Sequence, residues 1–241
     1  MRSVLLTATL VAMFPLACHA GDLVINVRHD LARLAICDAN AAGDGQANDS
    51  PAIQAAINHA AADGGGTVFL PEGTYRVADG ELRPGVTLAG AGRDQTILRA
   101  LGTARMVILH GGTLRDLSAY GTPTEDVSGD GWVIAVKQGS GGTPTSSHII
   151  SVQDAVDPHI ENVRVMESRY DCLYTRGSRG LRVSNSEFDR SGRNIVSMVG
   201  DDEDFAFTNC RFGSLWRLYH FDIEPNGGRF VRNGSFIGCE F

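Results

Sequence analysis

The stretch RVSNSEF, residues 182–188, aligns with three other stretches of the chain: HIENVRV at 159–165, AFTNCRF at 206–212 and SFIGCEF at 235–241. The last apolar positions of the four stretches are separated by 23, 24 and 29 residues. From residue 86 onward, short apolar runs alternate with Gly, Asn, Asp and Ser. A strand-rich repeat of this length without a crossover helix is typical of one coil of a solenoid, whose coils stack about 4.8 Å apart. The sequence therefore predicts an all-β fold, a parallel β-helix.

The same alignment places like residues above one another. Asn162, Asn185 and Asn209 fall in one column, and we expect them to hydrogen-bond along the axis of the solenoid. A second column is apolar and is expected to fill the interior: Val165, Phe188, Phe212 and Phe241. Cys210 aligns with Cys239, and this pair is either a disulfide or two inward-facing free thiols.

Ahead of the repeats, the pattern predicts one helix over residues 49–63. Asp49 or Ser50 can cap its first amides, Pro51 suits its first turn, and Gly64 suits a left-handed stop. Apolar residues recur along it at helical spacing, so one face must cover other residues: Ile53, Ala56, Ile57 and Ala60. A short buried strand and a turn follow at residues 65–75.

A family resemblance rests on this N-terminal part, which contains GDG at 43–45, NDSPAIQAAI at 48–57 and GGGTVFLPEGTY at 64–75. It closely resembles the first segment of pectate-lyase-like proteins, which include rhamnogalacturonase-like and polygalacturonase-like enzymes, mannuronan C5-epimerases and phage tailspike depolymerases. With the coils, the resemblance covers residues 22 to 241. It implies a right-handed parallel β-helix, capped at its N-terminal end by the helix at 49–63, that displays a carbohydrate-binding groove. Because this fold carries lyases, hydrolases, epimerases and non-catalytic adhesins, it does not decide the activity.

Residues 1–20 resemble a signal peptide, with Arg2, an apolar run at 4–17 and small residues up to Ala20. This predicts a secreted or periplasmic protein whose β-helix domain spans residues 21–241; a lipoprotein modified at Cys18 is the alternative. No later stretch approaches the roughly 20 apolar residues of a membrane span, so no membrane partner is predicted. The net charge of −7, without a basic stripe, argues against nucleic acid.

An acidic polysaccharide is the predicted partner, and it requires arginines or a cation to reverse the local field of an acidic protein. Arginines concentrate on two adjacent coils, at positions 169, 176, 179, 182, 190 and 193. Of these, Arg176 and Arg193 are the predicted substrate ligands, together with Tyr174; exposed turn arginines are the alternative. No cofactor or metal ligand is assigned, although the acidic turn at Asp201-Asp202 is either solvated or a calcium site.

Strand alternation predicts which residues face a groove. It directs Leu173, Val196 and Phe221 inward, and it displays three others in an outer column: Tyr174, Ser197 and Asp222. Arg176, Val199 and Glu224 form the next column, and His220 is expected beside Asp222. Residues two apart on one strand face have Cα atoms about 7 Å apart, and the like charges of Asp222 and Glu224 would raise the pKa of one of them, which suits a general acid or base. Asp222, Glu224 and His220 are therefore predicted catalytic residues, against the alternative of a solvated strand face.

The run Tyr219-His220-Phe221-Asp222 resembles the Tyr-x-Phe-Asp core of mannuronan C5-epimerases. By that resemblance, Tyr219 exchanges a proton with the sugar C5 and Asp222 binds or polarises the uronate. The chain departs from the family where Ile223-Glu224 replaces a Pro-His pair, so His220 or Glu224 would have to substitute for that histidine. The Asn-Thr-Asp, Gly-His-Gly and Arg-Ile-Lys motifs of polygalacturonases do not occur in the sequence.

The predicted function is that of an exported enzyme acting on a uronate-containing polysaccharide by proton abstraction at C5, as a lyase or an epimerase. Hydrolysis by Asp222 with Glu224, or binding without catalysis, are the alternatives. Phe241 aligns with an apolar core position, so the last coil ends without a cap. Either the chain is a fragment or a partner, such as a second copy, covers this end.

Overall fold

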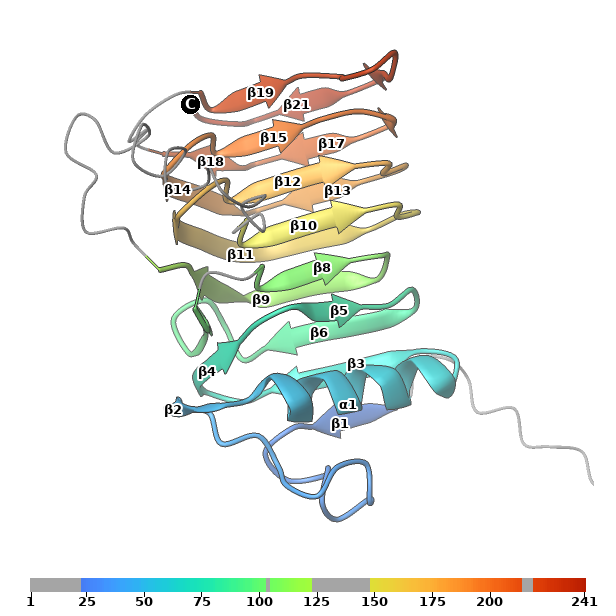
Figure 1. Ribbon diagram of the computed structural model, residues 1–241, viewed down its shortest axis with the longest axis vertical. Coiled ribbons are helices and arrows are strands. Elements are labelled where there is room, and N and C mark those ends of the chain that lie inside the picture. Colours follow the sequence, from blue (N-terminus) through green and yellow to red (C-terminus); the bar gives the residue numbers. More distant parts are fainter. Residues whose placement is uncertain (1–22, 103–104, 123–147, 214–218) are drawn as a thin grey trace, which may run out of the picture.

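The computed structural model describes residues 23–102, 105–122, 148–213 and 219–241. The predicted signal peptide lies outside these residues. Within them, strands pair in parallel and stack coil upon coil along one axis (Figure 1). No helix in this part of the chain is long and apolar enough to cross a membrane.

A 13-stranded sheet forms one side of the stack. Its main path runs through β1 (Val24–Asn26), β3 (Gly66–Leu70), β6 (Val86–Gly90), β9 (Thr113–Tyr120), β11 (His159–Ser168), β13 (Arg182–Ser184), β17 (Ala206–Thr208) and β21 (Ser235–Ile237). Beside this path lie β2 (Asp44–Asn48), β4 (Gly73–Val77), β7 (Thr96–Ala100), β14 (Glu187–Ser191) and β18 (Arg211–Phe212).

The opposite side is a six-stranded sheet, which we call the front sheet. It consists of β5 (Gly80–Leu82), β8 (Val107–Leu109), β10 (Ile150–Gln153), β12 (Leu173–Arg176), β15 (Val196–Met198) and β19 (Phe221–Ile223). A short pair, β16 (Asp202–Glu203) and β20 (Val231–Arg232), bridges the last two coils. The apolar core lies between the sheets.

The predicted coil register is confirmed residue by residue. His159 pairs with Arg182, Arg182 with Ala206, and Ala206 with Ser235. In the apolar column, Val165 pairs with Phe188 and Phe188 with Phe212. The Phe212 and Phe241 rings stack with centroids 5.2 Å apart, but Phe241 is 64% exposed, so the expectation that the column fills the interior holds for its first three members and not for Phe241. Cys210 and Cys239 are free thiols, so the second of the two alternatives for this pair holds.

The three stacked asparagines share one backbone conformation, with a positive φ. Asn162, Asn185 and Asn209 have φ of 50°, 50° and 52°, a conformation that asparagine tolerates better than most residues. Asn209 Nδ2 donates to Asn185 Oδ1 at 3.5 Å, whereas Asn162 Nδ2 donates to Asp116 Oδ1 at 2.7 Å. All three asparagines adopt the positive φ, whereas the axial hydrogen bond joins one pair of them.

This geometry predicts a difference between two substitutions at Asn185. Both Asn185→Gly and Asn185→Ala remove the side-chain amide, but only alanine resists a positive φ. We expect Asn185→Ala to be less stable than Asn185→Gly by about 1 kcal/mol, measured by urea unfolding. Equal midpoints for the two variants would contradict the assigned backbone conformation.

The predicted helix is α1 (Ser50–Ala62), and its buried face contains Ala52, Ile53, Ala56, Ile57 and Ala60. It packs against β3, β5 and β6 (Figure 1). Because β1 continues the large sheet beyond β3, the helix is not the outermost element, and its capping role stays a prediction.

The predicted N-terminal cap of α1 is wrong in its detail. Asp49 occupies the N-cap position without a side-chain cap hydrogen bond. Its carboxylate instead accepts from the Ala42 amide at 2.7 Å, and the Ser50 hydroxyl accepts from the Ala78 amide at 2.9 Å. Both side chains therefore fasten α1 to neighbouring segments.

The acidic turn at Asp201-Asp202 is not solvated throughout, which corrects one of the two interpretations of it. Asp202 is buried and accepts hydrogen bonds from the Thr175 hydroxyl at 3.0 Å and from the Ser178 amide and hydroxyl at 3.0 and 2.6 Å. Burial raises its pKa, against the effect of these hydrogen bonds. Within the four described segments, no group of three or more His, Cys, Asp or Glu residues is placed to hold a metal ion.

Candidate active site

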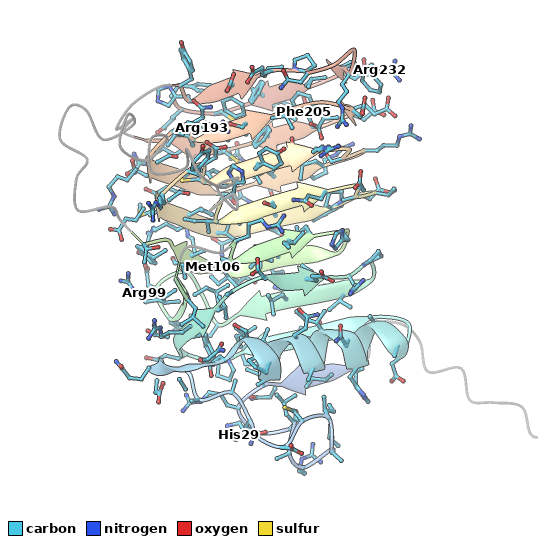
Figure 2. All side chains as sticks on the ribbon, viewed as in Figure 1. His29, Arg99, Met106, Arg193, Phe205 and Arg232 are labelled. Carbon is cyan, nitrogen blue, oxygen red and sulfur yellow. The ribbon has the colours of Figure 1, made fainter. Side chains whose placement is uncertain are left out.

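An open groove of about 510 Å³ crosses the outer face of the front sheet near its C-terminal coils. It is formed by β12, by residues next to β15 and by the segment after β19. Its lining residues are His148, Tyr170, Tyr174, Arg176, Arg193, Val199, Glu224, Asn226, Gly227 and Arg229. Arg193 lies on this side of the molecule, near β12 and β15 (Figure 2). Three arginines line the groove, and two of them face carboxylates: Arg193 binds Asp171, and Arg229 lies 3.7 Å from Asp201.

The strand register builds the outer column that alternation predicts. Ser151 pairs with Tyr174, Tyr174 with Ser197, and Ser197 with Asp222. The inward residues Leu173, Val196 and Phe221 pair in the same order. Each coil thus contributes one outward side chain to the same face of the groove.

A buried carboxylate anchors the site. Asp171 is fully buried, and the Arg193 guanidinium binds it through two nitrogens, with Nε 2.8 Å from Oδ1 and Nη2 on Oδ2. The Asn194 amide donates to the same Oδ1 at 3.0 Å. His148 Nδ1 lies 3.1 Å from Oδ2, within ion-pair distance, although its direction does not satisfy a hydrogen bond.

These partners explain how Asp171 stays ionised. Burial alone would raise its pKa, but the contact with His148 and the hydrogen bonds from Arg193 outweigh burial and hold the pKa below its usual range. A charged carboxylate in this position fixes the orientation of the guanidinium and of the imidazole above it.

A second network connects this anchor to Asp222 on the next coil. Asn194 Nδ2 donates to Asp222 Oδ2 at 2.8 Å and lies 3.1 Å from Ser197 Oγ, which is also 3.0 Å from Arg193 Nη2. One carboxylate oxygen of Asp222 is thereby held in place. The other oxygen has no protein partner within the described segments and is free for a ligand.

Aromatic rings complete the groove. The His148 and Tyr174 rings stack with centroids 4.4 Å apart, and Tyr170 meets His148 edge-on at 5.5 Å. The Arg193 guanidinium lies over the Tyr170 ring, 4.9 Å from its centroid. Burial raises the pKa of Tyr174 above its usual value, so its hydroxyl keeps its proton at neutral pH.

The predicted site residues do not all lie together. Tyr174, Arg176, Arg193 and Glu224 line the groove, and Asp222 joins them through Asn194. Tyr219 is 59% exposed and is not part of the lining.

His220 also lies outside the groove lining. Its Nε2 is 3.2 Å from the Gly213 carbonyl, and its ring meets Phe241 edge-on at 6.0 Å. The imidazole is therefore engaged at the apolar end of the last coil.

Sequence reasoning missed His148, Asp171 and Asn194. The strand register contained a signal for them. Ile150, Leu173, Val196 and Phe221 align with one another, so the residues two positions before each must also lie one above the other. These residues are His148, Asp171, Asn194 and Tyr219. We call these four residues the corner column. It immediately precedes the front-sheet strands, and its first three members are at most 3% exposed.

Comparisons with known proteins place the chain in a family. The model of the rhamnogalacturonase A/epimerase, pectate lyase-like family matches residues 34–215. Mannuronan C5-epimerase AlgE6 of Azotobacter vinelandii is 36% identical over 224 residues, which cover 82% of this chain and 25% of the relative. Plasmin and fibronectin-binding protein A of Streptococcus pneumoniae (strain ATCC BAA-255 / R6) is 30% identical over 184 residues, 70% of this chain and 26% of the relative.

Among solved structures, the tailspike protein gp49 of Acinetobacter baumannii bacteriophage Fri1, a capsular polysaccharide depolymerase, superimposes with a TM-score of 0.67. The match has 20% sequence identity and covers 90% of this chain and 40% of the tailspike chain, so it bears on the fold alone. The chain spans between 5% and 26% of the length of the curated relatives that it matches. By its family match and its coil architecture, the chain belongs to the rhamnogalacturonase A/epimerase family of pectate-lyase-like proteins, with the right-handed parallel β-helix fold that the family resemblance implied.

Proposed function

We propose that this protein is an exported enzyme that binds a uronate-containing polysaccharide in the front-sheet groove and abstracts the proton at C5, as a lyase or an epimerase. One observation carries the proposal: arginines and proton-transferring side chains line the same groove. The similarity to a mannuronan C5-epimerase supports it. Export is supported by the pattern of residues 1–20.

The groove supplies what C5 chemistry requires. The proton on C5 becomes acidic only when the neighbouring carboxylate is neutralised, because the charge that develops on abstraction spreads onto that carboxylate. Arg176 is exposed and forms no ion pair with any described residue, and Arg229 pairs only loosely with Asp201, at 3.7 Å. These two guanidinium groups are therefore available to bind uronate carboxylates.

Hydrolysis is the second candidate, and it is favoured by the position of two carboxylates. Asp222 and Glu224 are two residues apart on one outer face, and Glu224 lines the groove. Such a pair can divide the roles of acid and base in glycoside cleavage. Binding without catalysis is the third candidate, and the similarity to plasmin and fibronectin-binding protein A supports it.

Incubation with alginate and with polygalacturonate, in D₂O, distinguishes the candidates. We expect ultraviolet absorbance from an unsaturated uronate if the outcome is elimination, or deuterium at C5 without chain cleavage if it is epimerisation. A neutral glucan is the control and should give neither signal. New reducing ends without unsaturation would replace the proposal with hydrolysis, and binding without any product would replace it with an adhesive function.

A further inference from the structure

Unpaired polar atoms gather on one face of the molecule. In the segments that the structure describes, three buried side-chain polar atoms have no hydrogen-bond partner: His148 Nδ1, Ser151 Oγ and Asn194 Oδ1. His148 and Asn194 belong to the corner column, and Ser151 pairs with Tyr174 in the outer column. His148 Nδ1 still has the Asp171 carboxylate 3.1 Å away, whereas no such neighbour is found for Ser151 Oγ and Asn194 Oδ1 among the described residues. A buried polar atom without a partner costs roughly 1–3 kcal/mol, so these two atoms on one face indicate a site where a ligand supplies the missing partners.

His148 is the member of this set that can exchange a proton. It is 3% exposed, yet it lines the groove. Because its Nδ1 faces Asp171 Oδ2 at 3.1 Å, Nε2 is the ring nitrogen left for a substrate. A base whose second nitrogen is turned toward a buried carboxylate has the arrangement of an activated histidine, and the contact often tightens only when substrate binds.

We infer that His148 Nε2 is the base that removes the C5 proton, and that Asp171 is its positioning residue. The inference rests on the proposed function and names the proton acceptor that the function requires. Neither Tyr219 nor His220 lines the groove, and His148 is the histidine of its lining.

The proton and electrons balance within the groove. The C5–H bond breaks, the proton moves to His148 Nε2, and the electron pair delocalises into the uronate carboxylate held by arginine. In elimination, the C4=C5 bond forms, the C4–O4 bond breaks, and O4 takes a proton from Tyr174, which regains one from the imidazolium. In epimerisation, water returns a proton to C5 from the opposite face, and the imidazolium loses its proton to solvent.

The groups that face His148 shape this step. Asp171 contacts its Nδ1 side, Tyr174 stacks on its ring, and Tyr170 meets its edge. Arg193 binds the same carboxylate, so Asp171 is held in a fixed position beside the imidazole.

Steady-state kinetics against pH test the assignment. His148→Gln should lower kcat by about 100-fold while KM changes little, because the base acts only in the transition state. The matched control is His110→Gln, whose Nδ1 contacts the Gln153 carbonyl outside the groove lining and which should keep wild-type kinetics. Thermal unfolding of each variant checks that it folds.

The dependence of the rate on pH distinguishes a base from a residue that only supports the fold. The wild-type rate should rise with pH as the imidazole loses its proton, and this acidic limb should vanish in His148→Gln. In Asp171→Asn the imidazole loses the carboxylate that orients it, so kcat should fall while KM changes little.

Two results would overturn the role of His148 while leaving the proposed function intact. They are full activity of folded His148→Gln and an unchanged acidic limb of the pH profile in that variant. If the variant does not fold, a wild-type kcat that does not fall on acidification overturns it instead. Wild-type protein that produces neither unsaturated nor C5-deuterated sugar overturns the proposed function, and this assignment with it.

Discussion

Replacing Asp222 with asparagine should remove turnover, with kcat falling by about 10² to 10⁴-fold. The Asp222 carboxylate sits in the outer column beside Ser197, and one of its oxygens is held by Asn194 at 2.8 Å. Asparagine keeps the size of the side chain but loses the charge, and it can present an NH₂ group to the Asn194 donor. Both the hydrogen bond that Asp222 accepts from Asn194 and any proton transfer at this position would be lost.

The matched control for this variant is Asp94→Asn. The Asp94 side chain is 84% exposed and pairs with Arg164 on β11, in the large sheet. We expect it to keep full activity, since exposed ion pairs contribute little. Product formation from a uronate polysaccharide measures both variants, and an Asp222→Asn protein with wild-type kcat would remove Asp222 from the site.

Replacing Phe207 with alanine should destabilise the protein by about 3–5 kcal/mol. Phe207 is fully buried, stacks on Phe236 at 5.3 Å and meets Phe221 edge-on at 5.2 Å. Removing the ring leaves a cavity between the two sheets at the coil that carries Asp222, and the parallel strands around it cannot collapse without breaking their register.

Phe230→Ala is the control for this loss. Phe230 is 39% exposed and contacts the Arg232 guanidinium, 4.4 Å from its ring centroid. Its removal should cost about 1 kcal/mol or less. Urea unfolding followed by circular dichroism compares the two variants, and similar midpoints would show that the aromatic stack is not the core of the last coils.

Much of the fold was predictable because parallel coils repeat their chemistry. The stretch at 182–188 carries an apolar residue that must point inward and an asparagine that must occupy a corner, so its alignment with three other stretches fixed the strand register. The helix was predicted to within one residue at each end, because Pro51 and Gly64 mark its limits.

The site was predictable only where strand alternation applies. Tyr174, Ser197 and Asp222 lie within strands, and their shared column followed from a period of two. The corner column precedes the strands, where alternation gives no direction. The burial of Asp171 also depends on Arg193, a residue 22 positions away. Asp202 was misjudged for the same reason, since its partner Thr175 comes from the preceding coil.

The residues of the corner column come from successive coils, one from each coil. Asp171 and Asn194 lie on neighbouring coils, and Asp222 lies on the coil after Asn194. Loss of a single residue inside β12 or β15 would turn the following side chains of that strand to the opposite face of the sheet and interrupt the outer column. Loss or duplication of a whole coil would keep the stacking and place a different residue beside Asp171. A change of a whole coil would therefore alter the groups that face a ligand while the stacked sheets stay intact.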